Sequence, residues 1–310
     1  MGAIFLRTNC CFEKDYFDYY ALENSIRDIK NKYSFVEISS IGKSILGRSI
    51  PRITLGKGNK NIIYIGAHHG MEWITSAILI KFIYDFADDY QYGKQVFDIS
   101  TRVLFETRKI HIIPMLNPDG VNYAIHGIES TNVLRERLIK MNNDSDDFSH
   151  WQANARGIDL NHNYYSGFTE YKIIERKLGI SNGAPTKFSG NHPESEPETK
   201  SLCNFVRFEL PSLALSLHTQ GEEIFYTSGE KSAKNSLAIV KTLSRLTGYK
   251  ISIPTGSACY GGFTDWFIEE LNRPSFTLEC GLGENPLPFS NFDKIYSSLK
   301  RALFTTPILI

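Results

Sequence analysis

The chain has 310 residues, 42% hydrophobic and 22% charged, which is an ordinary composition for a globular protein. Lys plus Arg and Asp plus Glu both number 34, so the formal net charge is zero. This balance argues against a protein that binds nucleic acid or an anionic membrane through a basic excess. The length suits one large α/β domain with an ample core.

The sequence was also searched for targeting signals and cysteine motifs, and neither indicates another class of protein. Residues 1–15 lack the features of a signal peptide, and no stretch approaches the roughly 18 consecutive apolar residues of a membrane helix. The five cysteines show no C-x-x-C spacing, which disfavours a disulfide framework and a cysteine-type zinc site. We therefore expect a cytoplasmic protein with reduced thiols.

Apolar residues at helical spacing over residues 14–33 predict an amphipathic N-terminal helix. Short apolar runs at 61–67 and 109–115 predict central strands, and the pattern over 72–86 predicts a helix. The second of these strands ends in Asn117-Pro118-Asp119-Gly120, which predicts a turn. Further strands are expected over 35–39, 49–55, 213–217 and 275–280, and further helices from 195 and over 232–246, 263–271 and 291–304.

Strands that alternate with helices are typical of a mostly parallel or mixed sheet covered on both faces. No repeat, low-complexity run or linker divides the chain. We therefore expect an α/β fold in which residues 1–310 form a single domain. Its twisted, mixed and mostly parallel sheet would carry helices on both faces, with a helical segment, residues 1–35, packed on it.

Two long polar segments interrupt this pattern, residues 141–170 and 179–193. Loops of this length inside a compact domain are usually either functional or disordered. Trp151, Tyr164 and Tyr165 lie in the first segment and favour a functional loop, because aromatic side chains can pack.

The stretch around Gly66 places two metal-binding residue types at the junction of a strand and a helix. His69 and Glu72 follow the strand at a spacing of i, i+3. An imidazole nitrogen and a carboxylate that converge there would suit a zinc ion, which needs one more protein ligand and an open position.

The third ligand and a base have candidates at the ends of other strands. His218 follows the apolar run 213–217, and Glu279 lies near the end of the run 275–280. Ligand sites in open α/β sheets gather at the carboxyl ends of strands, so these side chains are expected to meet His69 and Glu72.

Five motifs occur in the order found in the zinc carboxypeptidase A-like peptidases, and the chain resembles this family over most of residues 40–285. The motifs are G-A-H-H-G-M-E-W (66–73), N-P-D-G (117–120), R-G-I-D-L-N-H-N-Y (156–164), S-L-H-T (216–219) and T-L-E-C-G (277–281). Three segments are similar to the bacterial branch that cleaves γ-D-glutamyl–diaminopimelate bonds in peptidoglycan peptides. They are S-E-P-E-T (195–199), H-T-Q-G-E-E-I-F-Y (218–226) and L-G-E-N-P-L-P (282–288).

The resemblance implies one Zn²⁺ per chain, with a coordination position left for water. It also implies a general base for that water, a cation that stabilises the oxyanion and a carboxylate that orients a histidine ligand. The implied ligands are His69, Glu72 and His218, the base is Glu279, the cation is Arg156 and the orienting carboxylate is Asp159.

Two positions depart from the family pattern on the substrate side. An Asn-Arg pair grips the terminal carboxylate in the carboxypeptidases, whereas this chain has Asn161-His162. Histidine is a weaker and pH-dependent partner, with a reference pKa of about 6.5. The place of the family's mobile tyrosine holds Ser257, and we expect the nearby Tyr260 to substitute. Asn161, His162 and Tyr260 are thus the expected substrate-binding residues.

These observations predict zinc-dependent hydrolysis of a small peptidoglycan-derived peptide at the γ-D-glutamyl–diaminopimelate amide. The first alternative is a general metallocarboxypeptidase acting on ordinary L-peptides. The second is an inactive module that binds a cell-wall peptide. Neither nucleic acid nor membrane is expected as a partner, and the oligomeric state is left open.

Overall fold

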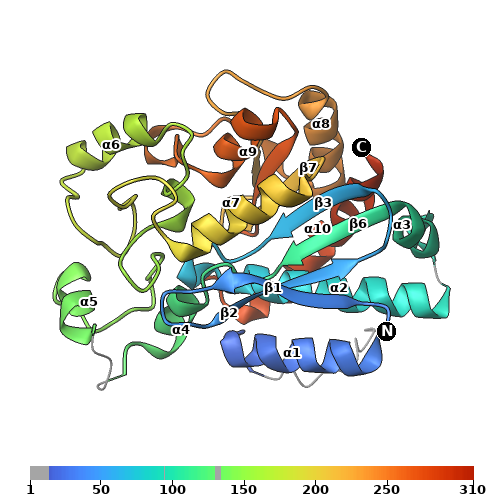
Figure 1. Ribbon diagram of the computed structural model, residues 1–310, viewed down its shortest axis with the longest axis horizontal. Coiled ribbons are helices and arrows are strands. Elements are labelled where there is room, and N and C mark those ends of the chain that lie inside the picture. The colour runs from blue at the N-terminus through green and yellow to red at the C-terminus, as the bar shows by residue number, and fades with distance from the viewer. Residues whose placement is uncertain (1–13, 94, 130–133) are drawn as a thin grey trace.

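The computed structural model describes residues 14–310, apart from residue 94 and residues 130–133 (Figure 1). The expectations for residues 1–13, including most of the segment searched for a signal peptide, lie outside the described residues. Among the described helices, none combines the length and apolar character needed to cross a membrane.

One mixed sheet of eight strands runs through the described part of the chain, in the order β1-β2-β6-β3-β7-β10-β8-β9. The four central strands β6, β3, β7 and β10 are parallel, whereas the pairs β1-β2, β2-β6 and β10-β8 are antiparallel. This confirms the mixed, mostly parallel sheet. The strands are β1 (Glu37–Lys43), β2 (Ser49–Leu55), β3 (Lys60–Ile65), β6 (Arg108–Ile113), β7 (Leu213–His218), β8 (Glu223–Phe225), β9 (Lys250–Ile251) and β10 (Ser275–Glu279), with β4 (Gln95–Val96) and β5 (Ile99–Ser100) forming a separate ribbon.

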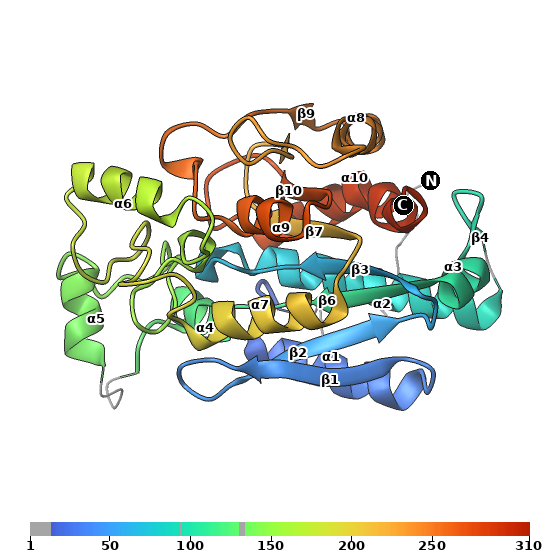
Figure 2. The same ribbon diagram turned by 45° about the horizontal axis from the view of Figure 1, so that its top comes forward.

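Helices cover both faces of the sheet, as expected (Figures 1 and 2). Helices α7 and α9 pack on one face, and α2, α8 and α10 pack on the other. The helices are α1 (Tyr19–Lys32), α2 (Ile74–Tyr92), α3 (Thr101–Thr107), α4 (Pro118–His126), α5 (Arg135–Met141), α6 (Phe168–Lys177), α7 (Pro197–Glu209), α8 (Ser236–Thr247), α9 (Phe263–Leu271) and α10 (Phe292–Thr305).

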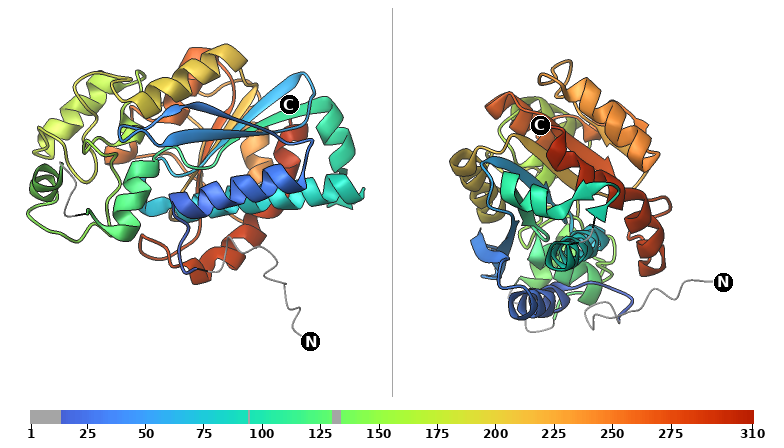
Figure 3. Two further views of the ribbon diagram at one scale, coloured as in Figure 1. Left: turned by 60° about the horizontal axis from the view of Figure 1, so that its bottom comes forward. Right: turned by 90° about the vertical axis from the view of Figure 1, so that its right-hand side faces the viewer.

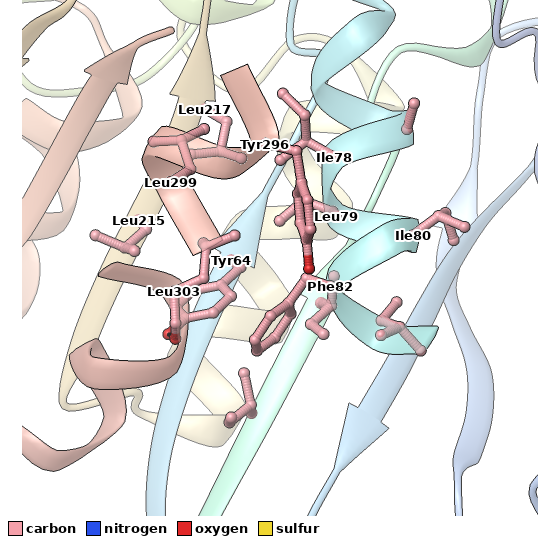
Figure 4. Close-up of a cluster of buried hydrophobic side chains, with 14 of the residues drawn as sticks. Tyr64, Ile78, Leu79, Ile80, Phe82, Leu215, Leu217, Tyr296, Leu299 and Leu303 are labelled. Carbon is pink, nitrogen blue, oxygen red and sulfur yellow. Dashed lines mark hydrogen bonds between the residues drawn. The ribbon is translucent and has the colours of Figure 1, made fainter. Parts of the chain in front are cut away.

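The central strands are apolar on both faces because both faces are covered. In β3, Ile62 and Tyr64 belong to the core on one side, whereas Ile63 and Ile65 belong to the core on the other. Figure 4 shows the first of these cores, where Tyr64 of β3 lies among side chains of α2, β7 and α10. The continuous apolar run in the sequence therefore contributes side chains to both hydrophobic cores.

The N-terminal helix packs along α2 (Figure 3), and its Tyr19 hydroxyl donates to the Ser49 carbonyl of β2 over 3.1 Å. The Tyr84 hydroxyl of α2 donates to Asp28 Oδ2 of α1 over 2.8 Å. The Asp18 side chain caps α1 by accepting from the N–H of Ala21 over 2.8 Å, so the helix begins later than the predicted residue 14.

Two expectations about irregular segments were wrong. Residues 117–120 do not form an isolated turn, because Pro118 opens α4 and the Asn117 side chain caps it by accepting from the N–H of Gly120. Residues 141–170 are not irregular throughout, because α6 begins at Phe168. Pro at the first helical position and Asn at the cap are helix-start signals as well as turn signals, and here the helix prevails.

Candidate active site

The turn after β3 is held tightly against the neighbouring segments. The N–H of Gly70 donates to the Gln152 carbonyl and the N–H of Met71 donates to the Trp151 carbonyl, both over 2.9 Å. A Cβ at Gly70 would lie 2.4 Å from the backbone of Gly120 in α4, so only glycine fits there. This packing fixes the start of the 3₁₀ turn Gly70–Glu72, which carries one of the expected metal ligands.

His69, Glu72 and His218 converge as expected, with their ligand atoms all within 4.8 Å of one another. His69 Nδ1 lies 2.8 Å from Glu72 Oε1, and His218 Nδ1 lies 3.0 Å from Glu72 Oε2. Two imidazole nitrogens thus face one carboxylate, which is a donor set suited to a catalytic zinc site.

Asp159 orients the first of these histidines. Its Oδ1 lies 3.0 Å from His69 Nε2, and its Oδ2 accepts from the backbone N–H of Lys187 over 2.9 Å. Burial disfavours the charged carboxylate, but the nearby His69 and His162 hold the pKa of Asp159 far below its usual range. An ionised Asp159 accepts the Nε2–H of His69 and leaves Nδ1 facing Glu72, as a metal ligand requires.

The charges in the cluster also fit a bound cation. Burial opposes ionisation, yet the His69 and His218 rings lower the pKa of Glu72. Burial likewise opposes protonation of His69, but Glu72 and Asp159 raise its pKa well above the usual value. The pocket therefore favours a positive charge between these side chains, and a metal ion supplies one without a proton.

Glu279 lies beside this cluster at the end of β10. It is the parallel register partner of His218 on β7, and the N–H of Cys280 donates to the His218 carbonyl over 2.7 Å. Burial, reinforced by the charge of Glu72, raises the pKa of Glu279 to about 8. A carboxyl group whose pKa lies near neutrality is suited to accept and return a proton.

A cavity of about 190 Å³ opens at the cluster. The metal-site and base residues His69, His218 and Glu279 contribute to its wall. The remaining lining residues are Gln152, Asp159, Asn161, His162, Thr186, Lys187, Phe225, Thr227, Pro254, Ser257, Ala258, Gly262, Thr264, Asp265 and Thr277. Hydroxyl, amide and charged groups outnumber apolar side chains in this wall, so it suits a polar ligand.

Asn161 and His162 line the cavity, as expected for substrate-binding residues. The Asn161 Oδ1 accepts from the N–H of Phe263 over 3.1 Å, which ties it to the start of α9. The His162 Nδ1 lies 3.0 Å from the Tyr260 carbonyl, and its ring stacks on Tyr171 at a centroid distance of 3.7 Å. Burial lowers the pKa of His162, so the ring is neutral at pH 7.

Three predicted site residues do not line the cavity: Glu72, which belongs to the metal-ligand cluster, and Arg156 and Tyr260, which do not. The Arg156 side chain is 51% exposed, and its Nη1 lies 3.7 Å from Glu196 Oε2. Tyr260 is 39% exposed and packs against Gly167, and its carbonyl rather than its hydroxyl meets the site. The oxyanion role of Arg156 and the substrate-binding role of Tyr260 stay predictions.

Several polar lining residues were missed by the sequence reasoning, among them Gln152, Lys187 and Asp265. Burial raises the pKa of Asp265 to about 7, and its Oδ2 accepts from the N–H of Gly262 over 3.3 Å. The long polar segments that carry Gln152 and Lys187 were the available signal, although only the first of them, residues 141–170, was predicted to be a functional loop.

Comparison with known proteins agrees with this geometry. A family model described as zinc carboxypeptidase (peptidase M14) matches residues 22–301. The chain is 34% identical, over 281 residues, to γ-D-glutamyl-L-diamino acid endopeptidase 1 of Lysinibacillus sphaericus, which covers 90% of this chain and 69% of that protein. It is 28% identical to human carboxypeptidase B over 265 residues, covering 79% of this chain and 58% of that protein.

The fold likewise matches a solved structure. The crystal structure of thrombin activatable fibrinolysis inhibitor superposes with a TM-score of 0.72 at 21% identity, covering 94% of this chain and 74% of that one. Together with the three converging ligands and the matched motifs, the family model identifies the cofactor as Zn²⁺. The chain is a metallopeptidase that belongs to the zinc carboxypeptidase family.

Proposed function

We propose that this protein hydrolyses the γ-D-glutamyl–diamino acid amide of peptidoglycan-derived peptides. The observation that carries the proposal is the state of His162, which stands where the carboxypeptidases have a permanent cation. Its Nδ1 faces the Tyr260 carbonyl, its ring is stacked on Tyr171, and burial keeps it neutral. The similarity to an endopeptidase named for this bond supports the same choice.

The residues in and around the cluster have different roles in the proposed hydrolysis. A Zn²⁺ held by His69, Glu72 and His218 would polarise the scissile carbonyl and acidify a water molecule. Glu279 takes a proton from the attacking water and returns it to the leaving amine. Burial beside Glu72 raises the pKa of Glu279, which makes its carboxylate a stronger base for the first of these steps.

Two further residues complete the proposed centre. Asp159 keeps the His69 ring in the orientation that turns Nδ1 toward the cluster, since it accepts from Nε2. Arg156 would stabilise the developing oxyanion, which requires its guanidinium to leave Glu196 and enter the cavity.

The proposal is tested by offering the zinc-loaded protein two substrates. One is the tripeptide L-Ala-γ-D-Glu-diaminopimelate, and the other is an N-blocked L-dipeptide with a C-terminal aromatic residue. Mass spectrometry should show release of diaminopimelate from the first and little cleavage of the second. Cleavage of the dipeptide alone would overturn the proposal in favour of a general carboxypeptidase, the activity for which the carboxypeptidase B relative is named.

A further inference from the structure

We propose that Lys187 binds a free carboxylate of the diamino acid on the leaving side of the scissile amide. This inference rests on the proposed function and names the residue that takes over carboxylate binding in this chain. Among the described residues that line the cavity, Lys187 is the only lysine or arginine. A carboxylate that enters the cavity therefore has one permanently charged partner in its wall.

The backbone of Lys187 is fixed from both sides by residues of the site. Its N–H donates to Asp159 Oδ2 over 2.9 Å, and its carbonyl accepts from the Tyr171 hydroxyl over 3.2 Å. Asp159 also holds His69, so Lys187 is positioned relative to the metal ligands through one shared carboxylate. Tyr171 also stacks on His162, so it contacts two of the residues that line the cavity.

The conformation of Lys187 is unusual for a residue with a side chain. Its φ of +64° lies in the left-handed region, which is sterically unfavourable for a residue with a Cβ atom. The two backbone hydrogen bonds hold this conformation, and Lys187 is one of the residues that line the cavity. Backbone strain of this kind is concentrated at ligand-binding sites.

The positive charge of Lys187 is not neutralised by an ion pair among the described residues. No carboxylate of the described residues forms an ion pair with its Nζ within 4.0 Å, and its side chain is half-buried. Asp159, the nearest acidic partner of its backbone, is already engaged by His69. The ammonium group of this half-buried lining residue is therefore available for an anionic ligand, and a charge-assisted hydrogen bond is among the stronger ones.

His162 cannot perform this task in its neutral form. A carbonyl only accepts, so the Nδ1 that faces the Tyr260 carbonyl carries the hydrogen. The Nε2 of the neutral ring is then an acceptor, which repels a carboxylate and suits an amine. The loss of arginine at this position is thus compensated elsewhere in the wall, at Lys187.

The rest of the wall fits the other groups of a diamino acid. Thr227, Thr264 and Thr277 supply hydroxyls, and Asp265 supplies a buried carboxyl group. Their oxygen atoms can accept hydrogen bonds from an ammonium group of a bound ligand. The favoured leaving residue therefore carries both a free carboxylate and an additional amine.

The test compares Lys187→Met and Lys187→Arg on two γ-D-glutamyl peptides that differ only in whether the diaminopimelate carboxylates are free or amidated. Lys187→Met should raise KM for the free acid roughly 10- to 100-fold, the loss expected for a hydrogen bond to a charged group. The amidated peptide should change by less than about threefold, and Lys187→Arg should restore most of the affinity because it restores the charge. An equal change for both peptides, or none for either, overturns the proposal.

Lys177→Met is the matched control, because Lys177 is an exposed lysine of the neighbouring helix α6 and does not line the cavity. It should leave both KM values unchanged. Zinc content and thermal midpoint of Lys187→Met should match those of the wild type, which separates a binding defect from misfolding.

A second measurement separates this inference from the proposed function. Calorimetry on the zinc-loaded Glu279→Gln variant would compare diaminopimelic acid with its diamide, with and without Lys187→Met. Tighter binding of the acid that disappears with Lys187 supports the inference even if the tripeptide is not cleaved. Failure of the wild type to cleave the tripeptide, with this preference intact, refutes the proposed function alone.

Discussion

The metal-ligand corner and the substrate wall of the cavity are built in different ways. The corner comprises His69, Glu72, His218 and Glu279, and its last two residues are register partners on adjacent parallel strands. The wall consists mainly of loop residues, and Lys187 in it has a positive φ. In the proposed mechanism, sheet register positions the residues assigned to the reaction, whereas loop contacts between distant segments position those assigned to substrate binding.

The difference explains how the reaction can be kept while the substrate changes. A strand end cannot move without disturbing hydrogen bonds along the sheet, so the corner is rigid. A loop tolerates new residues, provided that its few anchoring hydrogen bonds remain. In this protein, the anchor between the two parts is Asp159, which binds His69 of the corner and Lys187 of the wall.

The largest expected effect is in the corner. Glu279→Gln should lower kcat by about 10²- to 10⁴-fold, because the amide cannot accept the proton of the attacking water. Zinc content, measured by atomic emission, should remain that of the wild type, since Glu279 is not one of the three converging ligands. Wild-type turnover in this variant would refute the assigned base.

The next effect concerns Glu198, a buried carboxyl group in the first turn of α7. Burial, together with the charges of Asp119 and Glu196, raises the pKa of Glu198 from 4.5 to about 7. The folded state therefore binds this proton more tightly, so its contribution to stability is complete below about pH 4.5 and is lost as the pH rises through about 7. The difference, 7 minus 4.5, corresponds to at most about 3 kcal/mol.

Glu198→Gln keeps the shape of the side chain and removes this titration. Its free energy of unfolding, measured by urea denaturation, should fall less steeply than that of the wild type between pH 4.5 and 7. Parallel curves for the two proteins would show that Glu198 does not titrate in this range.

A smaller effect tests whether Arg156 belongs to the reaction centre. If its guanidinium reaches the oxyanion, Arg156→Met should lower kcat about 10²-fold, with little change in KM. Its pairing with Glu196 predicts a different outcome, a loss of stability with kcat unchanged. Steady-state kinetics alongside thermal unfolding distinguish these outcomes, and an unchanged kcat would remove Arg156 from the mechanism.

The smallest effect tests the link between corner and wall. Asp159→Asn should weaken zinc binding by roughly 10- to 100-fold, the usual consequence of losing a carboxylate that orients a histidine ligand. Competition with a fluorescent chelator measures this affinity, with the exposed Asp147→Asn as control. Addition of Zn²⁺ should raise the thermal midpoint of the wild type more than that of the variant. Equal zinc affinities would show that His69 does not need the Asp159 carboxylate in order to bind zinc.

Sequence alone was informative wherever the function of a residue follows from its place on a regular element. The i, i+3 spacing of His69 and Glu72 and the ends of the apolar runs before His218 and Glu279 were sufficient to predict the cluster. The reason is geometric, because the carboxyl ends of parallel strands meet at one edge of the sheet. The alternation of apolar strands and helices likewise predicted the mixed sheet that the structure shows.

Only the tertiary structure decided what lines the substrate side of the cavity. Lys187 reaches it through a left-handed backbone held by Asp159, which is 28 residues away. Arg156 and Tyr260 were expected there, but Glu196 and Gly167 are their neighbours. Such positions depend on contacts between loops far apart in the sequence, and no local pattern of residue types encodes those contacts. The sequence was therefore sufficient to predict the zinc peptidase class, whereas the residues proposed to bind the substrate were identified only from the tertiary structure.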